Sequence, residues 1–175
     1  MAWVVFLRAV NVGGSKSFKP SELPDRLDGL AATSIGAAGT FVVHGGDGAQ
    51  DVQAAIQDAL PFETEIMVRP GAELQALLAQ DPFGEEGQGG DVKRYLTVLS
   101  RRPGAAVELP VDKPAEGPWQ TRVVDLDGAY AFTVRRPEVP GRYYPNQVVE
   151  GLLGIPCTTR SWSTVERIGR SLGDG

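Results

Sequence analysis

Two nearly uninterrupted apolar runs in the first part of the chain constrain its fold more than any other feature. Residues 2–10 and 40–44 consist mostly of large apolar side chains, without the alternation of a half-exposed strand. Such runs are typical of central strands that are covered on both faces of a sheet. A helical apolar stripe follows each run, at residues 23–30 and 52–60. The sequence therefore predicts buried strands that alternate with amphipathic helices.

The order of elements up to residue 70 predicts a ferredoxin-like half. Short extended stretches at residues 33–37 and 65–69 complete the series strand, helix, strand, strand, helix, strand. This series is the βαββαβ pattern, in which the first and third strands, here the most apolar, lie at the centre of the sheet. Pro24 falls inside the first helical stretch, where it lacks an N–H to donate, and we expect a kinked or irregular first turn there.

The second half of the chain reads as a degraded repeat of the first. A strand at residues 92–99 precedes a hairpin at 123–134, whose Asp-Gly pair is a strong turn signal. Apolar stripes predict helices at 148–153 and 165–172, and proline-rich residues 102–118 are expected to form a loop. The fold class is therefore α+β, with two ferredoxin-like (βαββαβ-type) subdomains, the second degraded, that form one compact unit. The expected parts are a ferredoxin-like subdomain at 1–80, a glycine-rich connector at 81–91 and a second ferredoxin-like subdomain at 92–175.

Composition and charge exclude several classes of function. The formal net charge is −5 and the sequence pI is about 4.9, and an acidic chain repels phosphate backbones, so that broad nucleic-acid binding is disfavoured. One cysteine, Cys157, and one histidine, His44, permit neither an internal disulfide nor a Cys/His zinc site, and we expect no metal and no cofactor. The apolar runs are far shorter than the roughly 20 residues that cross a bilayer. We expect a cytoplasmic protein without a membrane segment.

A cluster of hydroxyl and basic side chains lies just before the last predicted helix. Ser163 begins an S-x-x-E capping box, which explains that serine without any function. Thr158, Thr159 and Arg160 are left, and a helix N-terminus behind hydroxyls and an arginine suits a phosphate or a carboxylate. In the alternative, which we favour because ion pairing is common, Arg160 pairs with an acidic residue and the threonines form an exposed strand.

The segment after the first strand is a second candidate for anion binding. Asn11, Gly13, Gly14 and Lys16 lie between a strand and a helix, where consecutive glycines can form a nest of backbone N–H groups. The alternative is a tight turn that needs positive φ at a glycine, which is the commoner use of such glycines. Arg8 stands on the strand itself, where its charge either meets an acidic partner or points into a cleft, and both interpretations stay open.

Several stretches carry a family resemblance. They read LRAVNVGG at residues 7–14, IMVR at 66–69 with EL at 73–74 and DPF at 81–83, and LGIPCTTRSWSTV at 153–165. Together they resemble a bacterial family known only by a number, the domain of unknown function 1697 family. The resemblance implies two ferredoxin-like halves, and it brings no established activity, so that the catalytic residues are unknown. The chain departs from the family pattern at residues 37–41, which have lost polar side chains, and at 143–146, where a Ser-Lys pair is usual.

The leading functional hypothesis is a binding module for a small anionic ligand, with no reaction assigned. The expected lining of its cleft is Arg8, Asn11, Gly13, Gly14, Lys16, Thr158, Thr159 and Arg160. One alternative is an enzyme that acts on a phosphorylated metabolite or nucleotide, although no nucleophile–base pair is visible. Another is a protein-interaction module that uses an exposed sheet face or the proline-rich residues 103–118. Tyr143 and Tyr144 offer a stacking surface, but we expect them to pack in the core.

Overall fold

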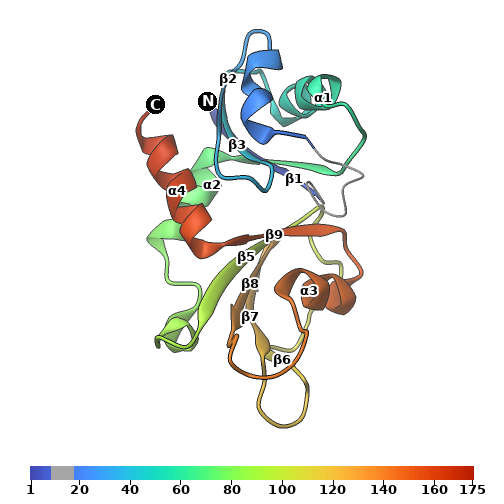
Figure 1. Cartoon of the computed structure of the whole chain (residues 1–175), viewed down its shortest axis with the longest axis vertical. Helices are drawn as coiled ribbons and strands as arrows, with labels where there is room; N and C mark the ends of the chain where they lie inside the picture. The colour runs from blue at the N-terminus through green and yellow to red at the C-terminus, as the bar shows by residue number, and fades with distance from the viewer. Residues whose placement is uncertain (9–17) are drawn as a thin grey trace. The chain divides into compact units, whose positions relative to one another are not determined.

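The computed structural model describes residues 1–8 and 18–175 of the chain (Figure 1). The described residues form two compact units. Unit 1 consists of Met1–Gln80 together with Ser163–Gly175, and unit 2 consists of Asp81–Trp162. Each unit has its own antiparallel sheet, so that the mixed α+β class predicted from the sequence is confirmed.

The sheet of unit 1 has the strand order predicted for a ferredoxin-like half. Its strands are β1 (Ala2–Leu7), β2 (Ala31–Ser34), β3 (Thr40–His44) and β4 (Ile66–Pro70), and they pair antiparallel in the order β2-β3-β1-β4. The two apolar runs, β1 and β3, therefore lie at the centre. One face of β1 presents Trp3, Val5 and Leu7 to a buried cluster that includes Val52 and Ile56 of helix α1 (Ala49–Ala59).

The helix expected around residues 23–30 is absent from the described structure. Two short 3-10 turns, η1 (Pro20–Glu22) and η2 (Pro24–Arg26), replace it. A proline opens each turn, because proline fixes φ and has no N–H for the preceding turn. Leu23 and Leu27 still reach the core, with 1% and 9% of their surface exposed, so that the apolar spacing was informative although its helical interpretation was wrong.

The last helix belongs to unit 1, whereas the sequence analysis expected it in the second subdomain, at residues 92–175. Helix α4 (Trp162–Gly173) continues from Trp162 of unit 2 into unit 1. It packs against helix α2 (Gly71–Ala79), where an added Cβ at Gly169 would lie 2.4 Å from Cδ1 of Leu78. Periodicity predicts an apolar stripe on this helix, but a stripe does not specify which sheet it covers.

The sheet of unit 2 repeats the strand order of unit 1 and adds one strand. Its strands are β5 (Lys93–Leu99), β6 (Val111–Lys113), β7 (Thr121–Asp127), β8 (Tyr130–Arg135) and β9 (Cys157–Ser161). The order is β6-β7-β8-β5-β9, in which β7-β8-β5-β9 corresponds to β2-β3-β1-β4. The predicted Asp-Gly hairpin is confirmed, with Gly128 at φ 58° between β7 and β8. Strand β6 lies in the expected loop, and it is too short to show a period.

Both faces of this second sheet are covered by apolar side chains. Helix α3 (Pro145–Leu153) packs on one face, where Val148 and Val149 join a cluster with Leu99 and Val123. On the other face the ring of Phe83 contacts the rings of Phe132 and Trp162 edge-on, with centroids 5.8 and 5.0 Å apart. The predicted connector at 81–91 therefore contributes to the unit 2 core, and it carries the short turn η3 (Gly84–Gly87).

Gly71, at the start of α2, is packed too closely to accept a side chain. A Cβ at this position would lie 2.7 Å from Cδ2 of Leu172 and 3.1 Å from the backbone oxygen of Ala2. We expect Gly71→Val to lower the free energy of unfolding by about 1–3 kcal/mol, as overpacking in other cores does. Urea denaturation measures this change. Gly173→Val is the matched control, because nothing lies within 4 Å of its added Cβ, and equal stabilities of the two variants would contradict the packing.

Candidate functional site

The structure distributes the sequence-predicted site residues over both units. Asn11, Gly13, Gly14 and Lys16 lie outside the described residues. Arg8 follows β1 in unit 1, where its backbone N–H donates to the carbonyl of Glu65 over 3.0 Å and its carbonyl accepts from Thr64 Oγ1 over 2.6 Å. The other three predicted residues, Thr158, Thr159 and Arg160, lie on β9 in unit 2.

On β9, Thr158 and Arg160 share one face of the sheet. Both are buried, with 6% and 5% of their surface exposed. Arg160 Nη1 donates to Thr158 Oγ1 over 2.6 Å and to the carbonyl oxygen of Thr159 over 2.9 Å. Burial lowers the pKa of Arg160 to about 10, because a low-dielectric environment disfavours the charged guanidinium. The strand is thus buried, rather than exposed as the alternative interpretation expected.

Thr159 points to the opposite face of the same strand, toward helix α3. Its Oγ1 lies 2.7 Å from Thr97 Oγ1 on the neighbouring strand and 3.1 Å from Asn146 Oδ1. The Sγ of Cys157 lies 3.6 Å from the same Asn146 oxygen. Because successive side chains of a strand alternate between faces, this hydroxyl cluster and the buried guanidinium do not converge on one ligand. The cluster attaches the start of α3 to the sheet.

A pocket beside α3 is the candidate site. This α3 pocket has a volume of about 590 Å³. It is lined by Lys113 at the end of β6, Arg142 and Tyr143 from the loop before α3, and Gln147, Val148, Gly151 and Leu152 from α3 itself. Volumes of about 300–1,000 Å³ are typical of pockets for small organic molecules.

The buried side-chain amide of Gln120 positions the loop that carries Arg142 and Tyr143. Gln120 Nε2 donates to the carbonyl oxygens of Val139 and Gly141 over 2.6 and 3.0 Å, and its Oε1 accepts from the backbone N–H of Tyr143 over 2.8 Å. Gln120 is 1% exposed, so that these bonds satisfy an amide that has little access to water. The loop is thereby held against the edge of the sheet.

Gly141 makes room for the ring of Tyr143. Gly141 has φ 143°, and an added Cβ would lie 3.0 Å from Cδ2 of Tyr143. The ring therefore rests on the Gly141 backbone, and 36% of the Tyr143 surface stays exposed. Tyr144 is 48% exposed, and Arg135 lies 4.9 Å from the centroid of its ring. Core packing of these tyrosines, which the sequence favoured, is wrong, because the loop runs along the surface.

The α3 pocket is positively charged. Lys113 and Arg142 supply two cationic side chains, and none of its lining residues is acidic. The neighbouring carboxylate of Asp112 does not neutralise the pocket, because Arg122 binds it through Nε over 2.6 Å and Nη2 over 2.8 Å. This hydrogen bond with Asp112 raises the pKa of Arg122. A local positive charge on an acidic protein attracts a small anion.

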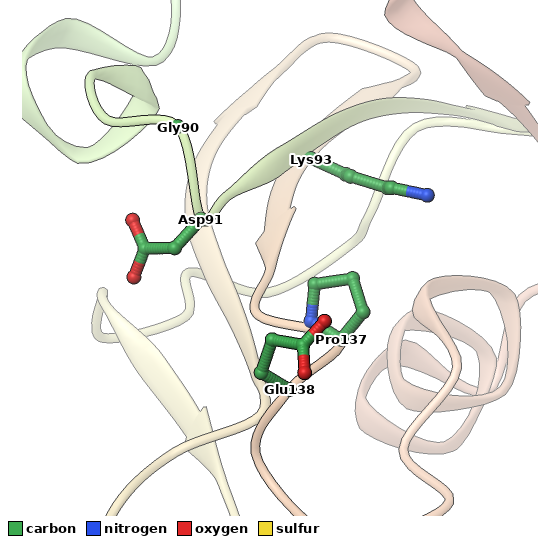
Figure 2. A pocket seen from close by; sticks show the side chains of 5 residues that line it. All are labelled: Gly90, Asp91, Lys93, Pro137 and Glu138. Atoms are coloured by element: carbon green, nitrogen blue, oxygen red, sulfur yellow. The ribbon is translucent and has the colours of Figure 1, made fainter.

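Two further hollows fit an anion less well. One of about 350 Å³ is lined by Asp91, Lys93 and Glu138 with Gly90 and Pro137, and Figure 2 shows the Asp91 and Lys93 side chains pointing away from each other. Its two carboxylates exceed its single cation. The other, of about 450 Å³ in unit 1, lies beside the glutamines of α1 and has no charged lining residue.

Sequence reasoning missed most of the α3 pocket. Lys113 lies in a segment expected to be a loop, and nothing in its neighbourhood distinguishes it from other surface lysines. The stretch from Gly141 to Tyr144 carried a usable signal, because a glycine and an arginine precede two aromatic residues. The role of Gln120 depends on hydrogen bonds to residues about 20 positions away, which no local pattern reveals.

The described residues offer neither a cluster of metal-ligating side chains nor a helix that could span a membrane. Among residues 1–8 and 18–175, no three His, Cys, Asp or Glu side chains are grouped so that they could hold a metal ion. Within the same residues, no helix has the length and apolar character that crossing a membrane requires.

Comparisons with known proteins identify a family and a fold. The family model described as "Protein of unknown function (DUF1697)" matches residues 1–127. The chain is also similar to a solved structure, that of the conserved bacterial protein SP0830 from Streptococcus pneumoniae. The two chains share 17% sequence identity and a TM-score of 0.60, over 97% of each chain. At this identity the likeness shows the fold alone. No curated protein matches the sequence.

The hydrogen bonds of Gln120 can be tested by removing them together. Gln120→Met keeps the side-chain volume but leaves the carbonyls of Val139 and Gly141 and the N–H of Tyr143 without this partner. We expect the free energy of unfolding to fall by about 1–3 kcal/mol, and the Tyr143 amide to exchange its hydrogen faster. Urea denaturation and hydrogen exchange measure the two effects. Gln53→Met, on an exposed position of α1, is the control, and an unchanged Tyr143 exchange rate would refute the role of Gln120.

Substitution of Arg160 is expected to stabilise the protein, in contrast to the substitution of Gln120. Its pKa in the folded state, about 10, lies below its ordinary value, so that the unfolded chain holds this proton more tightly and the charge costs stability at neutral pH. We expect Arg160→Met to raise the free energy of unfolding at pH 7 by up to about 3 kcal/mol, because a change of one in pKa corresponds to about 1.4 kcal/mol. This advantage shrinks above pH 10, where the folded protein releases the proton. Denaturation at pH 7 and above pH 10 measures the difference in stability, with Arg170→Met, at an exposed position, as the control. A destabilised Arg160→Met variant would show that the hydrogen bonds to Thr158 and Thr159 outweigh the cost of desolvation.

Proposed function

Because the chain belongs to the DUF1697 family, whose function is unknown, we propose its function from its own residues: it binds a small organic anion in the α3 pocket. The observation that carries this proposal is the charge of the pocket. Two cationic side chains and no acidic one line a hollow of about 590 Å³, on a chain whose formal net charge is −5. The ligand is a small molecule of the cytoplasm, where we predict this protein to be located.

The two cationic side chains suit a phosphate or a carboxylate in different ways. The planar guanidinium of Arg142 can donate two parallel hydrogen bonds to either group, whereas the ammonium of Lys113 acts as a compact point charge. They come from separate segments, β6 and the loop before α3. The Gln120 hydrogen bonds hold that loop in place, and a preformed site loses less conformational entropy when the ligand binds.

The lining of the pocket favours binding over catalysis. Its lysine and tyrosine can act as a base or a nucleophile, but the lining holds no serine, cysteine, histidine, aspartate or glutamate beside them. An enzyme that acts on a phosphorylated metabolite would need such a group within hydrogen-bond reach of the reacting atoms. We therefore place binding ahead of the enzyme alternative. We also place it ahead of a protein-interaction module, because a concave pocket suits a small molecule better than a flat partner.

The sequence-predicted residues remain an alternative location for the same class of ligand. Arg8 and Arg160 are the charged members of that set within the described residues. Burial lowers the pKa of Arg160, and ionisable groups with shifted pKa values are common at functional sites. The two locations predict different effects of substitution, and they can be separated by experiment.

Thermal unfolding with phosphate, sugar phosphates, nucleotides and carboxylates tests the proposal. A ligand at 100 times its Kd stabilises the fold by about 2.7 kcal/mol, which raises Tm by several degrees. We expect Lys113→Met with Arg142→Met to abolish the ligand-induced rise, because both charges that face the ligand are gone. Arg101→Met with Arg170→Met, at two exposed positions, is the charge-matched control and should retain it.

A third pair of substitutions separates the two locations. If Arg8→Met with Arg160→Met abolishes the rise in Tm and the Lys113 and Arg142 pair does not, the anion binds at the sequence-predicted residues. If no compound of the panel raises Tm in the unsubstituted protein, anion binding is refuted at both locations.

A further inference from the structure

The walls of the α3 pocket differ in chemistry, and the difference bears on the kind of anion it takes. Lys113 and Arg142 are cationic, whereas Val148, Gly151 and Leu152 present an apolar surface of α3. A volume of about 590 Å³ corresponds to roughly 20 water molecules at about 30 Å³ each. An inorganic anion occupies a small part of this space and leaves the apolar wall uncovered. The ligand that fits therefore has an apolar part as well as a charge.

Gly151 leaves part of this apolar wall without a side chain, so that the surface there is flat. Glycine is the least favourable residue after proline in a helix interior, yet Gly151 lies within α3. Neither packing nor backbone conformation explains it, because an added Cβ would meet no atom within 4 Å and its φ is not in the left-handed region. The missing side chain lets a ligand approach the helix backbone closely. A planar ring is the group that gains most from such a surface.

Tyr143 offers an aromatic surface to the same pocket. Its ring rests on Gly141, its backbone N–H is bound by Gln120, and about a third of its surface is open, with 36% exposed. A ring that is already held in place loses little entropy when a second ring stacks on it. Gln147 adds an amide with two donors and one acceptor, which matches the alternating donors and acceptors along the edge of a nucleobase.

We infer that the ligand of the α3 pocket is a mononucleotide, with its base against Tyr143 and the Gly151 surface and its phosphate at Lys113 and Arg142. The inference rests on the proposed function, since the phosphate uses the same two cations. A polynucleotide is disfavoured, because the net charge of −5 repels a long phosphate backbone. The two cationic side chains match the charge of one phosphate group, and the apolar wall with its aromatic ring offers a surface for a base.

Titration calorimetry of the full chain with four probes tests the inference: AMP, adenosine, ribose 5-phosphate and inorganic phosphate. We expect AMP to bind at least tenfold more tightly than each of the other three, because it alone offers both base and phosphate. Tyr143→Leu should weaken AMP binding by about 5- to 150-fold, the range of base–aromatic stacking. Tyr143→Phe, which keeps the ring, should bind AMP as the unsubstituted protein does.

Gly151→Leu provides a test that does not depend on destabilising the protein. Leucine favours a helix more than glycine does, and its Cβ meets nothing within 4 Å, so that Tm should stay equal or rise. Its side chain covers the flat surface, and we expect AMP affinity to fall at least tenfold while affinity for ribose 5-phosphate changes less than twofold. Gly173→Leu, on α4 with an equally open Cβ position, is the control and should bind AMP normally.

The outcomes separate this inference from the proposed function. Equal affinities for AMP and ribose 5-phosphate, with no effect of Tyr143→Leu or Gly151→Leu, would overturn the nucleotide inference and leave anion binding intact. Equal affinities for AMP and adenosine, with no effect of Lys113→Met and Arg142→Met, would overturn both, because the pocket would then take a neutral ring. Binding of none of the four probes would also overturn the nucleotide inference.

Discussion

One buried central strand in each unit is the constraint on which the rest of the fold depends. β1 pairs with β3 and β4, and β5 pairs with β8 and β9, so that each has a neighbour on both sides and apolar cover on both faces. In such a position the backbone N–H and C=O groups are bound within the sheet, and the buried side chains of the two strands are apolar apart from Thr97. The remaining strands and helices are placed by their contacts with these two.

The second unit shows how a repeated strand order can support a new surface. Four of its strands follow the order of the first unit, and β6 adds an edge beyond β7. This added strand brings Lys113 to the side of α3, where the loop held by Gln120 brings Arg142. The α3 pocket therefore lies where the second unit departs from the first. Departures from a scaffold are where binding residues commonly gather, because loops and edges vary without disturbing the core.

Arg160 and Arg142, both in unit 2, differ in how favourably their surroundings accommodate a positive charge. Arg160 is buried in the sheet, and its charge is disfavoured there, as its lowered pKa of about 10 indicates. Arg142 lies on the surface, where water solvates the guanidinium until a ligand replaces that water. A surface pair of cations can exchange ligands at little cost, whereas a buried cation is part of the folded structure. This contrast is the reason to look for a small exchangeable ligand at the α3 pocket first.

The sequence by itself determined the elements that local chemistry controls. Continuous apolar runs specified β1 and β3, the Asp-Gly pair specified the hairpin after β7, and the element order specified the class and topology. Pro24 indicated an irregular start of the first helix, but the sequence did not determine that 3-10 turns would replace the whole helix. Nor could it determine that α4 would pack on unit 1, because an apolar stripe fits either sheet. The α3 pocket was decided only by tertiary structure: its residues are separated by up to 39 positions, from Lys113 to Leu152, and a buried amide outside the pocket sets their geometry.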